Sequence, residues 1–182
     1  MKIEKTSIKD LVIIHPDVYT DERGYFFESY NQAKFNQEGL HYNFIQDNQS
    51  FSKRGVIRGL HLQINPFAQA KLLRVLEGEI LDVAVDLRKN SATYGQYESV
   101  VLSADNNKQL MIPPGFAHGF SVLSQTASVL YKVDRPYHKN SERGIRFDDP
   151  SLNINWQLDP NEIIVSEKDL VLPYFKDIDF EF

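Results

Sequence analysis

Apolar and polar positions alternate along much of this chain, and the alternation is clearest between Glu79 and Leu87. Four apolar residues fall on one face of an extended strand there: Leu81, Val83, Val85 and Leu87. The residues between them fall on the other face: Asp82, Ala84 and Asp86. A period of two is typical of a strand in a sheet with one buried face, and this is the prediction for the stretch.

Further strands are expected on both sides, separated by turn signals such as Glu77-Gly78 and Asn65-Pro66. The expected strands are Val56–Gln63, Lys71–Leu76, Tyr97–Leu102, Gln109–Ile112, Gly119–Leu123 and Ser128–Val133. Turns that recur about every ten residues favour an all-β sandwich or barrel.

The N-terminal part is less regular. Leu11–His15 indicates an early strand, Asp21–Gly24 a turn, and the aromatic run Tyr25–Tyr30 another strand. Asn31–Glu38 is the best helix candidate, because Asn31 can cap its start and a glycine follows its end. We therefore expect a mainly β protein with few short helices.

Length and composition fit one globular domain. The chain has 182 residues, of which 42% are hydrophobic and 25% charged. The residues after Val133 are more polar and are interrupted by prolines, so we expect loops and short turns that cover the barrel within a single domain over residues 1–182. The segment MKIEKTSIKDLVIIHPD lacks the long apolar run of a signal peptide or membrane span, which favours a cytoplasmic protein without a membrane partner.

Charge and cysteine content narrow the function classes. A net charge of −5 provides no basic field for nucleic acid, so an anionic ligand must be held by a local cluster. The absence of cysteine excludes disulfides and thiolate metal sites.

Candidate chemistry concentrates in the stretch Arg54–Ile80. His61 is either a half-buried histidine held by one hydrogen bond, or a general base that titrates near neutral pH. Lys71 shares a strand face with Leu73 and Val75. It is either an edge lysine whose ammonium reaches solvent, or a fixed positive charge that stabilises a developing oxyanion.

Arg58 lies three residues before His61, so a regular strand would place the two side chains on opposite faces. A bulge at Gly59 would let both line one pocket. Without a bulge, Arg58 points to solvent or to a partner chain.

The segment Ile112–Phe120 contains the pattern P-x-G-x-x-H, which ends in His118. It resembles the second motif of the cupin superfamily, whose histidine is often a metal ligand. The place of the first cupin motif reads His61-Leu62-Gln63, so its second histidine is missing. Two histidines without a suitably spaced carboxylate make a poor metal site. We therefore expect a metal-free cupin in which His118 binds a ligand or is structural.

Two residues late in the chain each have a structural and a functional interpretation. Tyr131 is either a core tyrosine with a satisfied hydroxyl or a general acid in a polar pocket. Asp169 ends the capping-box pattern Ser166-Glu167-Lys168-Asp169, or its carboxylate orients His61 and stabilises its protonated form.

Several segments together are similar to the dTDP-4-dehydrorhamnose 3,5-epimerase family of metal-free cupins. The segments are DERGYFFESY, IQDNQSFSKRGVIRGLHLQ, AQAKLLRVLEGEILDVAVDLR, IPPGFAHGFSVLS, YKV and VSEKD. This resemblance implies a cupin-type jelly-roll β-barrel, no cofactor, and a homodimer whose chains exchange their N-terminal strands.

The resemblance also implies a reaction. The third and fifth carbons of dTDP-4-dehydro-6-deoxy-D-glucose are inverted to give dTDP-4-dehydro-L-rhamnose. His61 matches the family base and Asp169 its supporting carboxylate, Lys71 matches the residue near the ketone oxygen, and Tyr131 matches the acid on the opposite face. Two alternatives remain open: a mono-epimerase acting on only one of these carbons of a related dTDP-4-keto sugar, and a sugar-nucleotide-binding cupin without catalysis.

The resemblance assigns further positions to substrate binding: Arg23, Glu28, Gln46, Asp47, Asn48, Arg58, Lys71, His118, Glu142 and Lys168. The cations among them can neutralise a diphosphate locally despite the net negative charge of the chain. Phe26 and Tyr137 are candidates for stacking on the thymine or the sugar.

Overall fold

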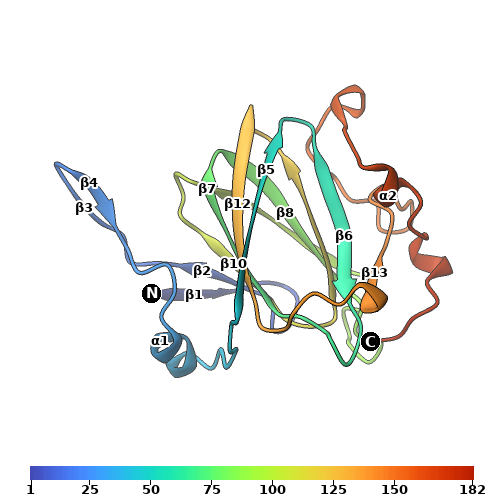
Figure 1. Ribbon diagram of the computed structural model, residues 1–182, viewed down its shortest axis with the longest axis horizontal. Coiled ribbons are helices and arrows are strands. Elements are labelled where there is room, and N and C mark those ends of the chain that lie inside the picture. Colours follow the sequence, from blue (N-terminus) through green and yellow to red (C-terminus); the bar gives the residue numbers. More distant parts are fainter.

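The computed structural model describes all 182 residues, which fold into a barrel made of two facing β-sheets (Figure 1). The six-stranded sheet has the order β1 (Lys2–Lys5), β2 (Val12–His15), β10 (Gln109–Ile112), β7 (Lys71–Glu77), β12 (Thr126–Val133) and β5 (Gln46–Lys53). The five-stranded sheet has the order β13 (Glu142–Gly144), β6 (Ile57–Gln63), β11 (Phe116–Val122), β8 (Glu79–Asp86) and β9 (Tyr97–Ser103). All pairs within these sheets are antiparallel, and the predicted mainly β architecture is confirmed.

Seven short elements complete the chain. They are the hairpin strands β3 (Tyr19–Asp21) and β4 (Gly24–Phe26), the α-helices α1 (Gln32–Gln37) and α2 (Glu167–Leu170), and the 3-10 turns Lys139–Ser141, Pro160–Glu162 and Phe175–Asp177, of which the last three are single turns. None of the helices has the length and apolar character needed to cross a membrane. The helix predicted at Asn31–Glu38 is confirmed, and the Asn31 side chain caps it by accepting a hydrogen bond from the Lys34 amide at 3.2 Å.

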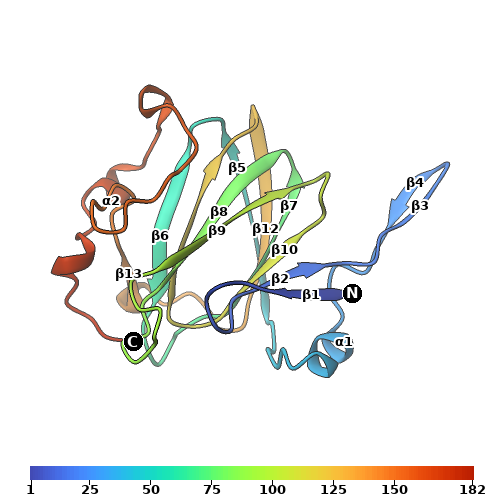
Figure 2. The same ribbon diagram turned by 180° about the vertical axis from the view of Figure 1, so that it is seen from behind.

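The strand β8 differs from its prediction, because both of its faces are buried. Ile80 and Ala84 belong to the core between the two sheets, and Leu81 and Val83 belong to a second core on the outer side of the five-stranded sheet. The second core is closed by C-terminal side chains: Leu152, Trp156, Ile178, Phe180 and Phe182. Figure 2 shows this C-terminal segment running beside β6 and β13. The expected polar face is therefore an inner wall of the barrel.

Two other predicted boundaries were wrong. The aromatic run Tyr25–Tyr30 is a strand only as far as Phe26, where β4 pairs with β3 in a hairpin. The strand expected from Gly119 begins at Phe116, because Phe116 and Ala117 already pair with β8.

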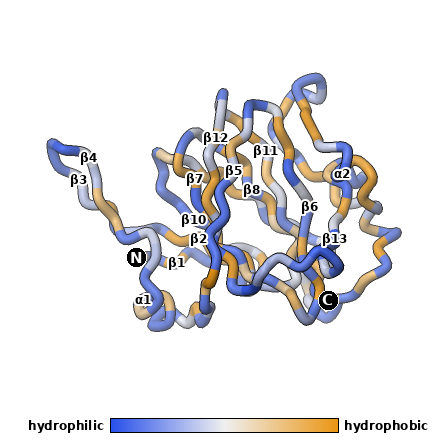
Figure 3. Tube along the Cα trace, viewed as in Figure 1, coloured by the Kyte–Doolittle hydropathy of each residue, from blue (hydrophilic) through white to orange (hydrophobic).

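Hydrophobic residues are concentrated in the strands of the barrel, with β5 and the β3–β4 hairpin as exceptions. The central strands carry much of the hydrophobic colour in Figure 3, whereas β5 is largely hydrophilic. The helix α1 covers the outer face of the six-stranded sheet, where Phe35 packs against Val12, Leu72 and Met111. No equivalent helix covers the β3–β4 hairpin, which projects away from the barrel (Figure 1). Its aromatic side chains are largely exposed, with Tyr19 and Phe26 each at 67%.

Candidate active site

A cavity of about 530 Å³ opens between the two sheets and is bounded by α2 and the segment before it. Seven predicted site residues line it: Arg58, His61, Lys71, His118, Tyr131, Lys168 and Asp169. A second cavity of about 290 Å³ shares His61, Lys71 and Tyr131 with the first. It adds three further predicted residues: Gln46, Asn48 and Glu142. The two cavities therefore form one continuous candidate site.

His61 and Asp169 form a hydrogen-bonded pair. The His61 Nε2 atom lies 2.7 Å from Asp169 Oδ1, and the Asp169 side chain is only 5% exposed. Burial raises the pKa of Asp169, but the hydrogen bond and charge of His61, together with hydrogen bonds from Gly59 and Ser166, outweigh this effect, and the net pKa is lowered. The carboxylate is thus held ionised against the ring. When Nε2–H donates to Asp169, the other ring nitrogen, Nδ1, carries the free lone pair.

The helix α2 places Asp169 in this position. The Ser166 side chain caps the helix by accepting a hydrogen bond from the Asp169 amide at 3.2 Å. The Asp169 carboxylate is turned toward β6, where it also accepts a hydrogen bond from the Gly59 amide at 3.3 Å. The predicted cap is therefore confirmed, and it orients the residue whose side chain contacts His61.

The predicted bulge at Gly59 is confirmed. Pairing between β6 and β11 shifts register between His61 opposite His118 and Arg58 opposite Phe120, so three steps on β6 match two on β11. The extra residue brings Arg58 and His61 to the same cavity. Gly59 has φ of +121°, and a Cβ there would lie 2.6 Å from the Gly119 Cα. Only glycine fits both the backbone conformation and this close approach.

Lys71 contributes a cation from the opposite sheet. Its Nζ atom donates to the His61 carbonyl oxygen at 3.4 Å, which spans from β7 to β6. Burial lowers the pKa of Lys71 to about 8, while the charges of Asp82 and Glu142 oppose that shift. The amine is therefore mostly protonated at pH 7 and sits close to its own titration.

Tyr131 also comes from the six-stranded sheet, on β12. Burial raises the pKa of its hydroxyl, with a smaller opposing effect from the Arg58 charge. The hydroxyl therefore keeps its proton at neutral pH and can donate it. Because His61 lies on β6 in the facing sheet, the two groups reach the cavity from opposite walls.

His118 lies deeper, and it has a partner that the sequence did not suggest. Its Nε2 atom is 2.7 Å from Asp82 Oδ1, and the Asp82 side chain is 0% exposed. Burial lowers the pKa of His118 despite the opposing effect of Asp82, so the ring is neutral at pH 7. Asp82 could have been found as an aspartate flanked by the apolar residues Leu81 and Val83, but the expectation that its face meets solvent concealed it.

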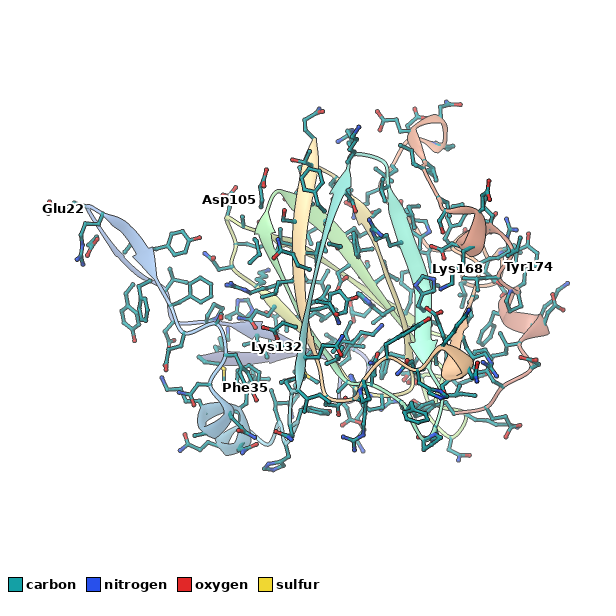
Figure 4. The ribbon with its side chains drawn as sticks, in the orientation of Figure 1. Glu22, Phe35, Asp105, Lys132, Lys168 and Tyr174 are labelled. Carbon is teal, nitrogen blue, oxygen red and sulfur yellow. The ribbon has the colours of Figure 1, made fainter.

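Polar groups surround the mouth of the cavity. Lys168 Nζ donates to Glu142 Oε2 at 2.7 Å, and the Tyr137 hydroxyl donates to the same oxygen at 2.9 Å. Figure 4 shows Lys168 on α2, beside β6. On β5, the Ser50 hydroxyl is buried without a hydrogen-bond partner and lines the cavity, although sequence reasoning did not single it out. Ser50 could have been found from the period of two of a strand, which places it on the same face of β5 as Asn48.

Three predicted binding residues lie outside the cavity of their own chain. Asp47 pairs with Lys132 at 2.8 Å on the outer face of the six-stranded sheet. Arg23 pairs with Asp21 at the exposed hairpin turn, and Glu28 pairs with Lys34. Figure 4 places Glu22, the neighbour of Arg23, far from the barrel at the tip of the β3–β4 hairpin, which forms the N-terminal arm of the chain.

Metal ligation finds no support in the side-chain arrangement. No group of three or more His, Asp or Glu side chains is placed to hold an ion. Gln63, at the position of the missing cupin histidine, instead forms hydrogen bonds with backbone groups of nearby loops. Its amide donates to the Phe67 and Pro136 carbonyl oxygens at 2.7 and 3.1 Å, and its oxygen accepts from the His138 amide.

Known proteins share this fold and much of this sequence. A sequence model of the dTDP-4-dehydrorhamnose 3,5-epimerase family matches residues 5–177. The dTDP-4-dehydrorhamnose 3,5-epimerase of Shigella flexneri is 49% identical over 99% of each chain. The crystal structure of the enzyme of that name from Elizabethkingia anophelis superimposes with a TM-score of 0.95 at 52% identity over 99% of each chain. An epimerase from Legionella pneumophila, solved in complex with dTDP-4-keto-L-rhamnose, superimposes with a TM-score of 0.94 at 45% identity over 98% of this chain and 94% of its own.

The fold and the paired histidine and carboxylate define a cupin-type epimerase, a jelly-roll barrel with its site between the two sheets. The match to the family model and these identities make the assignment specific. The chain belongs to the dTDP-4-dehydrorhamnose 3,5-epimerase family, as its motifs predicted.

Proposed function

We propose that this protein is an isomerase that inverts the third and fifth carbons of dTDP-4-dehydro-6-deoxy-D-glucose, giving dTDP-4-dehydro-L-rhamnose. One observation carries the proposal. A histidine backed by a buried carboxylate and a protonated tyrosine reach one cavity from facing sheets, with a lysine beside them. Inversion at carbon needs a base on one face of the sugar and an acid on the other, and these positions supply both.

The ketone at the fourth carbon makes the protons on both neighbouring carbons weakly acidic. His61 Nδ1 takes one of these protons, and Asp169 stabilises the imidazolium that forms. Electron density moves onto the ketone oxygen, where the Lys71 ammonium stabilises the enolate. The Tyr131 hydroxyl then protonates the same carbon from the other side, so its configuration is inverted. The cycle repeats at the second carbon after protons are exchanged with solvent.

The remaining cavity residues fit the nucleotide part of the substrate. Arg58 and Lys168 are cations at the same cavity and can bind the two phosphates, a local cluster within a chain of net charge −5. In this proposal the Tyr137 ring, which is exposed, stacks on the thymine. His118, Gln46 and Asn48 add hydrogen-bonding groups along the cavity walls, in keeping with their predicted role in binding.

A homodimer is part of the proposal, with the N-terminal arm of each chain reaching the cavity of the other. The β3–β4 hairpin exposes Tyr19, Tyr25 and Phe26, which together form an apolar surface suited to a protein contact. The same arm carries Arg23 and leads to Glu28, two predicted binding residues that do not line their own cavity, and the β3–β4 hairpin projects away from the barrel (Figure 1). Sedimentation should give a dimer. A mixture of inactive Arg23→Ala and His61→Ala chains should regain activity, since a mixed dimer contains one complete site.

Incubation with dTDP-4-dehydro-6-deoxy-D-glucose in heavy water tests the function directly. Deuterium is expected at both the third and the fifth carbon, in a product of inverted configuration. Label at one carbon only would identify a mono-epimerase, and binding without label would identify a non-catalytic binding protein. His61→Ala should abolish the exchange and keep nucleotide binding. One tightly bound metal per chain in elemental analysis would contradict the proposed chemistry, and cell fractionation tests the cytoplasmic location, which stays a prediction.

A further inference from the structure

Asp82 is a buried carboxylate that the reaction described above does not use. It lies on β8 between Ile80 and Ala84, whose side chains belong to the core between the sheets. One of its oxygens contacts His118, and the other, Oδ2, is buried without a hydrogen-bond partner. A neutral side chain of the same shape would avoid the cost of burying an unpaired charged oxygen. The carboxylate in this place therefore calls for a functional reason.

The contact with His118 provides one part of that reason. Since the ring is neutral at pH 7, its Nε2–H donates to Asp82 Oδ1 at 2.7 Å. This fixes the tautomer and leaves His118 Nδ1 as a hydrogen-bond acceptor, so the ring can accept a hydrogen bond from a sugar hydroxyl. An amide at position 82 can donate to Nε2 instead, which would turn Nδ1 into a donor.

Lys71 provides the other part. Its ammonium has a single long hydrogen bond, at 3.4 Å, to a neutral carbonyl oxygen. The negative charges that support it are those of Asp82, from the facing sheet, and Glu142, from the cavity rim. Glu142 already pairs with Lys168, so Asp82 is the carboxylate in this group without a cation of its own.

We propose that Asp82 is a positioning residue of this active site, which orients His118 and holds the Lys71 ammonium in its charged form. The proposal rests on the proposed function, because the charged Lys71 matters through the enolate that it stabilises. The titratable and charged groups that act on Lys71 or line the same cavities come from five strands, from α2 and from one loop: Asp82, Glu142, His61, His118, Tyr131, Arg58, Lys168, Asp169 and Tyr137. Among these, Asp82 is the fully buried anion.

The titration of Lys71 itself tests the proposal without an activity assay. The rate at which acetic anhydride labels Lys71 can be followed against pH by mass spectrometry of the purified protein. The wild-type midpoint should lie near pH 8, in line with the pKa of about 8 for Lys71. Asp82→Asn should lower this midpoint by about one pH unit, the lower end of what a nearby opposite charge contributes. Asp82→Glu, which keeps a carboxylate, should remain nearer to the wild type.

Asp86→Asn is the matched control. Asp86 is also on β8 and 0% exposed, but its partners are Arg88, Ser91 and Thr93, which do not line the cavity. Its substitution should leave the Lys71 midpoint unchanged. An Asp82→Asn midpoint equal to that of the wild type would overturn the proposal. An Asp82→Asn chain without native circular dichroism would also overturn it, since Asp82 would then serve folding.

Deuterium exchange gives the functional readout. The fall of the exchange rate at alkaline pH should begin at lower pH in Asp82→Asn than in the wild type. At pH 8 the exchange rate should drop about fivefold, because the protonated fraction of Lys71 falls from one half to about one tenth. A loss of the same size at every pH would indicate a structural role and contradict the proposal. If the wild type exchanged no deuterium, the proposed function would fail, while the Lys71 labelling would still decide whether Asp82 holds its charge.

Discussion

Replacing Asp169 by asparagine removes the charge behind the proposed base with little change of shape. The hydrogen bond at stake is 2.7 Å long, and its carboxylate side is 5% exposed, so solvent screens it little. A hydrogen bond to a charged group contributes about 1.5–3 kcal/mol, which corresponds to roughly 10- to 150-fold in the stability of the imidazolium.

The tautomer adds to this loss. The amide of asparagine can donate to His61 Nε2, which leaves the proton on Nδ1 and removes the lone pair that faces the substrate. A base held in the wrong tautomer loses most of its contribution, so the combined fall in proton abstraction should reach about 10²- to 10⁴-fold.

Deuterium incorporation at the third and fifth carbons measures this rate separately at each carbon. Ser166→Ala, which removes the cap but keeps the carboxylate, should cost far less, because a cap contributes about 1 kcal/mol. Asp159→Asn is the control, since Asp159 caps the Pro160–Glu162 turn and lines neither cavity. Exchange in Asp169→Asn near the wild-type rate, with nucleotide binding intact, would show that His61 needs no supporting carboxylate.

Three other changes have separate readouts. Tyr131→Phe should still exchange deuterium into the substrate, but inverted product should form about 10²- to 10⁴-fold more slowly, which NMR of the sugar protons resolves. Burial opposes the ionisation of Asp86, but hydrogen bonds from its neighbours outweigh this effect and lower its pKa to about 2. The folding stability that the ionised Asp86 contributes is present above about pH 4 and should be lost as the pH falls toward about 2. Urea unfolding should therefore find Asp86→Asn about 2 kcal/mol less stable than the wild type at pH 7, and roughly half that difference at pH 3. Gly59→Ala should lose about 3 kcal/mol in the same assay, because its Cβ meets the backbone of β11, whereas Gly39→Ala, also at positive φ but in open space, should lose about 1 kcal/mol.

The strand pattern could be predicted from local sequence because apolar alternation and turn residues act within a few positions. The error at β8 shows where that reasoning stops. Its polar face lines the barrel because the facing sheet covers it, and its apolar face is covered by residues near Trp156 and Phe182, far along the chain. A period of two shows that a strand has two different faces, but burial on each face depends on segments that the pattern does not contain.

The residues of the candidate active site were predicted on two kinds of evidence, strand geometry and resemblance to a family. Arg58 and His61 could be reconciled by geometry alone, since strand parity requires a bulge if both line one pocket and Gly59 lies between them, and the register shift confirms the bulge. Asp169 could not be placed by such reasoning, because 108 positions separate it from His61 and its capping role explained its identity equally well. Only the match of several motifs to a family brought these residues together before the structure did.

Each histidine of the cavity has a buried carboxylate behind it, and the two pairs differ in a way that fits different tasks. His61 is 28% exposed and contacts a carboxylate that the Gly59 amide also helps to hold, so its ring reaches the cavity surface. His118 is 9% exposed, and burial keeps its ring neutral. A group that must change charge during turnover has to keep contact with solvent, because burial penalises the charged state. The difference in exposure therefore supports the proposed roles of His61 in proton transfer and of His118 in substrate orientation.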